Sequence, residues 1–317
     1  MCPKPISRLR RPSETFDLNA AQFAGMIQKL WPRNGDVYAR LRISTRSHLV
    51  EDDDAQAVYA NLRFPMGLVH DQPITLQSGD AIRVSGYLTH NEYMETIHRF
   101  LQAARAESFL KGVPPEDLLS WQAITFRRTN ILLNVRSLIW LQPDGRPADP
   151  QNTGAGGPQL TEVEDAAALA DTKVFNRVVL EGIVARRWEY AENIFMRLAV
   201  YDRFTPLERG GKTGNRGRPR RKPHYITVRF TGGKVAGRPV TAKLKDRLRV
   251  TGTIGEQATK VTLHQALLET GSEEVVALLG RLPNADNTQE IQAQQESLHV
   301  EAVSLIAYSG RHESDIQ

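Results

Sequence analysis

The sequence "DRLRVTG" at 246–252 repeats the pattern of "DAIRVSG" at 80–86, and the two segments start 166 positions apart. Their surroundings match in both directions at nearly the same offset. The identical pairs are Asn19/Asn176, Gly25/Gly182, Trp31/Trp188, Arg40/Arg197, Leu41/Leu198, Tyr59/Tyr225, Arg63/Arg229, Phe64/Phe230, Gly67/Gly233, Thr96/Thr262, His98/His264 and Leu101/Leu267. Self-similarity at a fixed offset is the signature of a repeated structural unit. We therefore predict two copies of one domain, at about 18–141 and 175–308.

Chain length and composition agree with two domains in one soluble chain. At roughly 150 residues per domain, 317 residues accommodate two, and 40% hydrophobic residues are enough for real cores. No apolar run is long enough for a membrane helix, and the basic start "MCPKPISRLRRPSE" lacks the apolar stretch of a signal peptide. We expect a cytoplasmic protein without disulfides, because Cys2 is the one cysteine. The net charge of +5 mildly favours an anionic partner.

Composition also predicts where the domains begin and end. We expect a flexible basic arm at 1–15, a first barrel at 16–141, a Pro/Gly-rich linker at 142–172, a second barrel at 173–308 and a polar tail at 309–317.

Alternation of apolar and polar residues predicts five strands in each copy. The first copy has them at 19–27, 37–45, 59–67, 80–88 and 131–141, and the second at 176–185, 194–202, 224–232, 246–254 and 298–308. One helical stretch follows the fourth strand of each copy, at 95–111 and 272–282. Five short strands and a helix suit the oligonucleotide-binding barrel, or OB-fold. The predicted fold class is all-β with short helices, in tandem duplicated five-stranded barrels.

The outer face of the second and third strands carries aromatic and arginine side chains in both copies, since side chains alternate between the faces of a strand. The inward residues are apolar, such as Met196, Leu198 and Val200. The outward residues include Tyr38, Arg40, Arg42, Tyr59, Arg63, Phe195, Arg197, Tyr201, Tyr225 and Arg229. Aromatic rings stack on exposed bases and arginines pair with phosphate, so this mixture favours single-stranded nucleic acid. Tyr and Arg are also ordinary occupants of a half-buried sheet face.

The loop between the second and third strands differs in charge between the copies. In the second copy, the basic loop 205–223 contains "RGGKTGNRGRPRRKP", whose cations are Arg209, Lys212, Arg216, Arg218, Arg220, Arg221 and Lys222. Such a tract is expected to contact polyanions in a salt-dependent way, or else to be a solvated loop. The first copy has "HLVEDDDAQ" there, and we interpret these acids as solvated rather than as a metal site. The two copies are therefore expected to bind unequally.

The remaining chemistry-bearing residues give no sign of catalysis. Trp31 and Trp188 follow the first strand of each copy, where they either stack on bases or pack under the hairpin. His98 and His264 have no second ligand at metal spacing, so we interpret them as packing residues. No P-loop, nucleophile elbow or paired-histidine zinc motif occurs. We predict a binding protein, not an enzyme, with no cofactor and no metal.

Four segments of the second copy resemble the bacterial single-stranded-DNA-binding protein (SSB) family. They are "FNRVVLEGIV" at 175–184, "RLAVYDRF" at 197–204, "YITVRFTGG" at 225–233 and "LKDRLRVTGTI" at 244–254. In that family an opening Asn-hydrophobic strand ends in Gly, and a Lys/Gly-Asp-hydrophobic-Val-x-Gly strand follows later. The internal repeat extends the resemblance to the first copy.

The resemblance implies sequence-independent coating of single-stranded DNA in replication, recombination or repair, in the cytoplasm at the nucleoid. It implies stacking aromatics at Phe204, Tyr225, Tyr59 and Tyr93, with Thr259 at the last position in the second copy. Typical members carry one barrel and assemble four, so a two-barrel chain resembles those that reach four as a homodimer. The family's acidic recruiting tail is absent from the end "GRHESDIQ", which leaves recruitment of replication or repair proteins by that route in doubt.

Three functions remain from the sequence. The first is non-enzymatic binding of single-stranded DNA through the outward residues named above, together with Tyr93, Trp188, Phe204 and the cations of the basic loop. The second is an OB-fold scaffold for protein interactions, in which Tyr225 and Arg229 contribute no nucleic-acid affinity. The third is an RNA-binding OB protein, which would prefer ligands carrying the 2′-hydroxyl.

Overall fold

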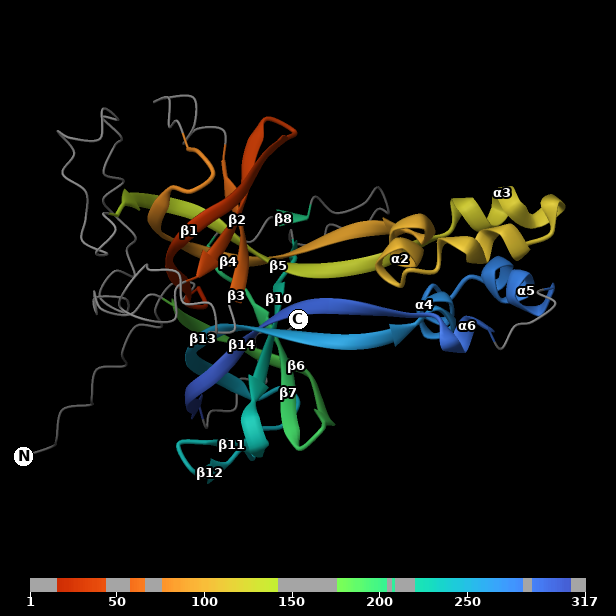
Figure 1. Cartoon of the computed structure of the whole chain (residues 1–317). Helices are drawn as coiled ribbons and strands as arrows, with labels where there is room; N and C mark the ends of the chain where they lie inside the picture. The colour runs from red at the N-terminus through yellow and green to blue at the C-terminus, as the bar shows by residue number, and fades with distance from the viewer. Residues whose placement is uncertain are drawn as a thin grey trace, which may run out of the picture.

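The computed structural model describes residues 16–43, 58–65, 76–141, 176–203, 207–208, 220–281 and 287–308. The predicted basic arm, linker and tail, and most of the two loops after the second strands, lie outside these ranges. The described residues form two barrels that share one ten-stranded sheet (Figure 1).

The first barrel closes with the strand order β1-β2-β3-β5-β4 and a final pairing of β4 with β1. Every pairing is antiparallel except β3 with β5. Its strands are β1 (Asn19–Arg33), β2 (Asp36–Ile43), β3 (Val58–Phe64), β4 (Ala81–Thr96) and β5 (Thr125–Trp140).

The second barrel repeats this topology as β6-β7-β10-β14-β13, closed by β13 with β6. Its strands are β6 (Asn176–Tyr190), β7 (Asn193–Val200), β10 (His224–Phe230), β13 (Arg247–Thr262) and β14 (Gln292–Tyr308). Two short hairpins add β8 (Leu207–Glu208) with β9 (Arg220–Arg221), and β11 (Lys234–Val235) with β12 (Arg238–Pro239), and a 3₁₀ turn, η3, spans Thr231–Gly233. The five-stranded closure with its one parallel pairing is that of an OB-fold, so the predicted fold class is confirmed.

The barrels join edge to edge through their first strands. Five residues of β1, Asn19 to Phe23, pair antiparallel with Asn176 to Leu180 of β6. The apolar interiors of both barrels then form one continuous core. The predicted inward residues Met196, Leu198 and Val200 are fully buried in it, as are Leu41 and Leu62 of the first barrel. Alternation therefore identified the core face correctly.

Two repeated residue types are explained by close approaches between strands. Asn19 donates from Nδ2 to the Leu88 carbonyl oxygen (2.8 Å) and accepts from the Leu88 N–H (2.9 Å), which ties β1 to β4. Asn176 forms the same two bonds with Ile254 (2.9 and 2.8 Å). At Gly86, a Cβ would lie 1.9 Å from a backbone carbonyl oxygen, so only glycine fits at this register shift. The two copies thus share a residue at positions where the barrel geometry allows only that residue type.

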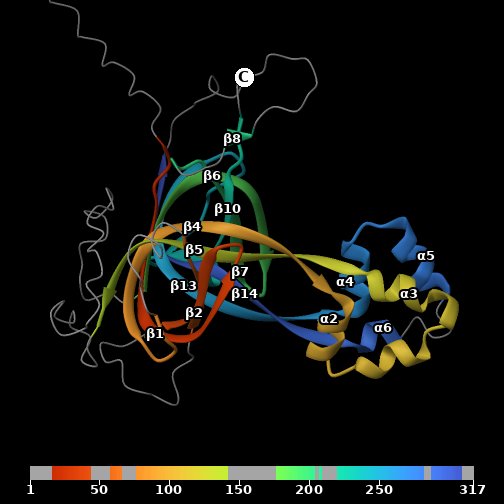
Figure 2. The ribbon, with the colours of Figure 1, turned by 90° about the horizontal axis from the view of Figure 1, so that it is seen from above.

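Strands β4 and β5 continue beyond the first barrel as a long two-stranded arm, and β13 and β14 do the same in the second (Figures 1 and 2). Both arms end in helices that pack into a second apolar core, here called the helical cap. Its elements are α2 (Ile97–Ala103), η1 (Glu107–Gly112), α3 (Pro115–Ala123), α4 (Leu263–Glu269), α5 (Glu273–Arg281) and α6 (Asn287–Glu290).

The prediction of one helical stretch per copy is wrong. In the first copy the stretch 95–111 breaks at Arg105, whose φ of 54° ends α2, and α3 follows as a separate helix. In the second copy α5 agrees with the predicted 272–282, but α4 precedes it. The cap combines both copies: Arg281 pairs with Asp117 (3.0 Å), and Arg128 lies 3.7 Å from Glu269. Within the described ranges, no helix has the length and apolar character to cross a membrane.

Candidate nucleic-acid interface

The predicted face lies on the outer side of β2 and β3 in the first barrel and of β7 and β10 in the second. Antiparallel pairing sets Tyr38 opposite Arg63 and Arg42 opposite Tyr59. All of these side chains are half-buried, as is Arg40. The site residues that the sequence predicted on the second and third strands of the first barrel therefore lie together on one surface.

Aromatic and guanidinium groups of the first barrel are held against one another. The rings of Trp31 and Tyr38 stack at 6.0 Å with planes 17° apart. The Arg40 guanidinium lies 4.6 Å from the centre of the Tyr59 ring, a cation–π contact. These contacts arrange flat, partly accessible groups side by side, which suits stacking against unpaired bases.

The Arg63 guanidinium is fixed by the strands on both sides of it. Its Nε donates to Asp36 Oδ2 at 2.7 Å, and its Nη1 donates to Asn134 Oδ1 at 3.3 Å. The side chain still retains 40% of its accessible surface. Arg63 can therefore present its remaining donors to a phosphate without reorganising.

In the second barrel the equivalent tryptophan also stacks on an aromatic ring, but that ring is buried. Trp188 stacks on Phe195 at 5.5 Å with planes 10° apart, and the Arg186 guanidinium lies 5.4 Å from the centre of the Trp188 ring. His299 of β14 packs edge-on against the other side of Phe195, at 6.4 Å. Phe195 is consequently only 5% exposed. It lies on the predicted face with its ring largely covered by these neighbours.

The two alternatives for the tryptophans, base stacking and packing under the hairpin, are not mutually exclusive in this structure. Trp31 and Trp188 each pack against an aromatic of the second strand, and both remain half-buried rather than enclosed. Arg186, which lies over Trp188, was missed in the sequence. It follows a register shift in β6 between Val184 and Arg186, and such a shift interrupts the alternation that identifies outward residues.

Arg229, the counterpart of Arg63, has a different acidic partner. Its Nε lies 3.8 Å from Glu301 Oε2 of β14. Burial raises the pKa of Glu301, but hydrogen bonds from His299 and Thr231 and the Arg229 charge outweigh it, so the pKa lies below its ordinary value. Glu301 therefore stays ionised and holds the guanidinium at the edge of the face.

Tyr201 and Tyr225 form the exposed aromatic part of the second face. Each is 38% exposed. Burial raises the pKa of Tyr201, and the Tyr225 hydroxyl adds to this effect. Tyr225 also lies opposite Ala199 of β7, two residues from Arg197. Arg42 and Arg197 are half-buried on the faces of the first and second barrel respectively.

Tyr93 lies apart from these clusters. It belongs to the β4–β5 arm, where it pairs with Arg128 and is 37% exposed. Of the predicted basic loop, Arg216 and Arg218 lie outside the described residues, as does Phe204. Arg220 and Arg221 form β9, and Lys222 is exposed directly after it.

The histidines that the sequence paired have unlike surroundings. His264 of α4 lies 3.2 Å from the Thr288 hydroxyl of α6, which agrees with a packing role. His98 is exposed on α2, so the packing interpretation is wrong for it. In the part of the chain that the structure describes, no group of three or more His, Cys, Asp or Glu residues could hold a metal ion.

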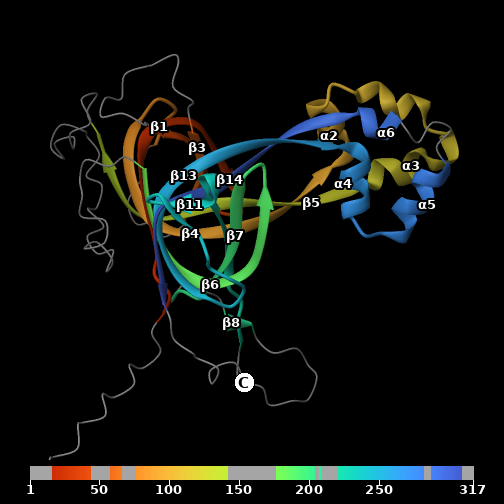
Figure 3. The ribbon, with the colours of Figure 1, turned by 90° about the horizontal axis from the view of Figure 1, so that it is seen from below.

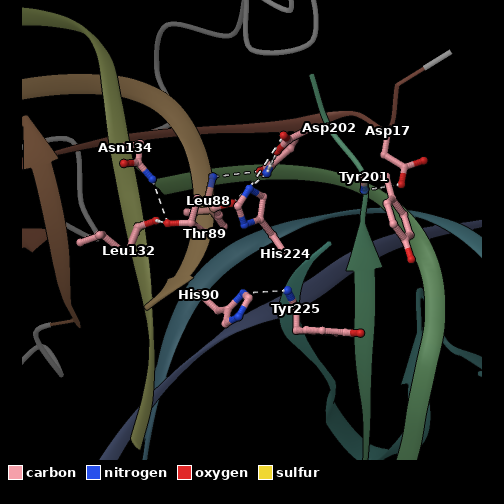
Figure 4. Close-up of polar contacts among 11 residues, drawn as sticks. Asp17, Leu88, Thr89, His90, Leu132, Asn134, Tyr201, Asp202, His224 and Tyr225 are labelled. Atoms are coloured by element: carbon pink, nitrogen blue, oxygen red, sulfur yellow. Dashed lines mark hydrogen bonds and ion pairs between the residues drawn. The ribbon is translucent and has the colours of Figure 1, made fainter. Parts of the chain in front are cut away.

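Two first-barrel residues that the sequence analysis missed, Tyr87 and His90, contact β10 of the second barrel, and Figure 4 shows His90 beside Tyr225. Tyr87 lies under the Arg136 guanidinium at 5.6 Å and faces His224 at 6.4 Å. The His90 ring meets Tyr225 edge-on at 5.7 Å. The predicted fourth strand ends at position 88, so the sequence placed His90 outside the sheet.

Comparisons with known proteins found no matching family model and no matching curated protein. Among solved structures, the wild-type single-stranded DNA binding protein from Thermus aquaticus is 11% identical, with a TM-score of 0.44 over 94% of this chain and 96% of that one. The S. cerevisiae mitochondrial protein Rim1 (10% identity, TM-score 0.24) and the Plasmodium falciparum SSB bound to ssDNA (13%, 0.25) each cover 41% of this chain and 98% and 100% of their own. At TM-scores below 0.5, these similarities assign this chain neither a family nor a function.

Proposed function

We propose that this chain binds single-stranded DNA without catalysis and largely without regard to sequence. The observation that supports this most is the recurrence of one arrangement on both barrels. In each, aromatic rings and arginines occupy equivalent outward positions on the second and third strands, as Arg40 with Tyr59 and Arg197 with Tyr225 do. Rings accept any base by stacking, at about 1–3 kcal/mol each, and guanidinium groups track the phosphates.

The proposed contact residues are Tyr38, Arg40, Arg42, Tyr59, Arg63, Tyr93, Trp188, Arg197, Tyr201, Tyr225 and Arg229, with Phe204 and the cations of the basic loop beyond the described residues. Phe195 supports Trp188 from below rather than meeting a base itself. We place the protein among factors of DNA replication, recombination or repair in the cytoplasm, and we propose a homodimer that presents four barrels.

The test is a titration with fluorescent oligo-dT of increasing length at low and moderate salt, beside matched duplex DNA and oligo-U. We expect tight, salt-sensitive binding of oligo-dT, weak binding of duplex, and a step in affinity once the oligonucleotide spans both barrels. Equal or absent binding of all three would contradict the proposal and favour the scaffold alternative. A preference for oligo-U would favour RNA, and sedimentation of the free protein tests the homodimer.

Two variants with the same change in charge separate the face from the rest of the surface. Arg197→Ala removes a guanidinium from the second barrel's face, whereas Lys111→Ala removes an exposed charge from the helical cap. We expect Arg197→Ala to weaken oligo-dT binding and to reduce its salt dependence by about one phosphate contact. Lys111→Ala should change neither.

A further inference from the structure

The two barrels meet at a second place besides the β1–β6 pairing, where β4 of the first barrel lies beside β10 of the second (Figures 2 and 4; Figure 3 shows the barrels from the opposite side). Here the backbone N–H of Tyr225 donates to Nδ1 of His90 at 3.2 Å. The His90 ring also meets the Tyr225 ring edge-on, at 5.7 Å and 61°. Tyr225 is the exposed aromatic second in β10 on the second barrel's face, so a residue of the first barrel fixes it at two points.

The charged surroundings of His90 belong mostly to the second barrel. The His224 ring of β10 lies 6.2 Å away, and the charges of Lys222 and of Arg197 on β7 both act on His90. On its own strand, Glu92 Oε1 lies 3.8 Å from His90 Nε2. His90 is therefore surrounded by the same cations that form the proposed DNA-binding face.

The hydrogen bond requires one protonation state of His90. Nδ1 can accept from the Tyr225 N–H only while it carries no proton, which is the case in the neutral ring with its hydrogen on Nε2. Burial, followed by the nearby His224 and the two cations, lowers the pKa of His90 below its ordinary value, although Glu92 opposes this. Burial likewise lowers the pKa of His224, against the pull of Asp202. The accepting form of His90 is thus maintained at neutral pH.

The arrangement occurs on one side of the molecule. By the repeat offset of 166, the counterpart of His90 is Glu256, which has no ring to meet a tyrosine edge-on. The counterpart of Tyr225 is Tyr59, which instead lies under Arg40 of its own barrel at 4.6 Å. The two equivalent tyrosines are consequently held by different means, one within its barrel and one from the neighbouring barrel.

We propose that His90 is a positioning residue of the second barrel's single-stranded-DNA surface: from the first barrel it holds Tyr225 in place for base stacking and makes the surface continuous across the junction. This rests on the proposed function above. It assigns the first barrel a contribution to binding by the second.

The first test examines the free protein and needs no DNA. With [¹⁵N]tyrosine, each of the 8 tyrosines gives one amide signal, and Tyr225→Phe identifies that of Tyr225. We expect the Tyr225 signal to shift as the pH falls below 6.5, in step with protonation of His90, and to lose this shift in His90→Asn. A Tyr225 signal that does not follow His90 would overturn the proposal.

The second test measures oligo-dT affinity at pH 8, where His90 is neutral. His90→Ala should bind roughly fivefold more weakly, the effect of one hydrogen bond, while His90→Asn, whose amide oxygen can accept in place of Nδ1, should retain most of the affinity. Glu256→Ala, at the equivalent place, is the matched control and should leave the affinity unchanged. In a Tyr225→Ala background, His90→Ala should have no further effect, because the residue that it positions is gone.

The outcomes distinguish this proposal from the one on which it rests. If wild type binds oligo-dT tightly but His90→Ala binds equally well, or loses the same factor with and without Tyr225, the positioning role is overturned and the proposed function stands. If wild type binds no oligonucleotide, the proposed function fails and this proposal fails with it. A fivefold loss that disappears in the Tyr225→Ala background supports it.

Discussion

Replacing Asn19 or Asn176, the equivalent asparagines at the start of each barrel, tests how much each one contributes to the unfolding free energy. Asn19 and Asn176 each join the first strand of a barrel to the fourth through two hydrogen bonds, to Leu88 and Ile254 respectively. Asn19 makes a third bond: its Nδ2 also donates to Asp202 Oδ2 of the second barrel, at 2.5 Å. We therefore expect Asn19→Ala to destabilise the protein more than Asn176→Ala.

The magnitudes follow from what each substitution leaves without a partner. Loss of either asparagine leaves one backbone N–H and one backbone carbonyl of the fourth β-strand without a hydrogen-bond partner. Each unsatisfied group costs about 1–2 kcal/mol of unfolding free energy. The bond of Asn19 to the Asp202 carboxylate, whose side chain is 3% exposed, adds about 2 kcal/mol. Asn19→Ala should thus lose about 4–6 kcal/mol of unfolding free energy and Asn176→Ala about 2–4 kcal/mol. Against typical totals of about 5–15 kcal/mol, the first variant is close to unfolding.

Urea denaturation followed by tryptophan fluorescence and circular dichroism measures both variants against wild type. Gln28→Ala, an exposed position on the same strand as Asn19, is the control and should change the unfolding free energy by less than about 0.5 kcal/mol. Equal losses in Asn19→Ala and Asn176→Ala would show that the Asp202 bond contributes nothing. Losses no larger than that of Gln28→Ala would refute the account of the asparagines as links between strands.

Three further predictions follow from local geometry. Burial raises the pKa of Asp17 to about 6 from 3.8. The neutral carboxyl therefore stabilises the fold fully below pH 3.8, and this stabilisation is lost as the pH rises through 6. In urea denaturation, the unfolding free energy of Asp17→Asn should rise by about 2 kcal/mol relative to wild type between pH 4.5 and 7.5. Glu192, at φ 65° in a turn that reads Asn-Gly in the first barrel, should gain about 1 kcal/mol as Glu192→Gly, seen as a raised Tm. Gly252→Ala would place a Cβ 2.1 Å from the Glu301 carbonyl oxygen and should lower the unfolding free energy by about 3 kcal/mol or more. Gly280→Ala, in open space within α5, should raise it by about 0.5–1 kcal/mol. The urea midpoints of the two variants compare these effects.

The two barrels were predictable because their interiors impose a periodic pattern on short segments. Ile226, Val228 and Phe230 alternate into the core of β10, and each is fully buried. The arms left no such pattern, because β4 leaves the barrel after Leu88. Beyond that residue the side chains up to Thr96 are exposed or half-buried on both faces, so no alternation marks the strand. The strand predicted from alternation therefore ended at Leu88, where one face of β4 stops being buried.

Helix prediction succeeded or failed for the same reason. In α5, Val275, Leu278 and Leu279 are buried at helical spacing, and the helix was found from the sequence. In α3, the buried residues are Trp121 and Asp117, one of them an acid that pairs with α5. A helix with so narrow an apolar side, held by an ion pair to the other copy, gives little periodic signal.

The outward residues of the candidate site were predictable one strand at a time, but their accessibility was not. Phe195 alternates outward as expected, yet Trp188 of β6 and His299 of β14 cover it from two sides. His90 reaches Tyr225 from another barrel, through a contact between residues 135 positions apart. Alternation reports only which side of its own strand a residue occupies, so contacts of this kind need the assembled fold.

Two copies joined in one chain can carry different residues at equivalent positions, which two identical chains cannot. In a symmetric dimer the two-fold axis places the same residue at both ends of every contact, so a histidine beside one binding face would lie beside the other. Here the position is His90 in the first copy and Glu256 in the second, and the tyrosines that they would serve are supported differently. Asn19 likewise reaches across the junction, through its bond to Asp202 of the second barrel. Both residues act across the junction between the barrels, so a substitution of either in the first copy changes contacts of the second.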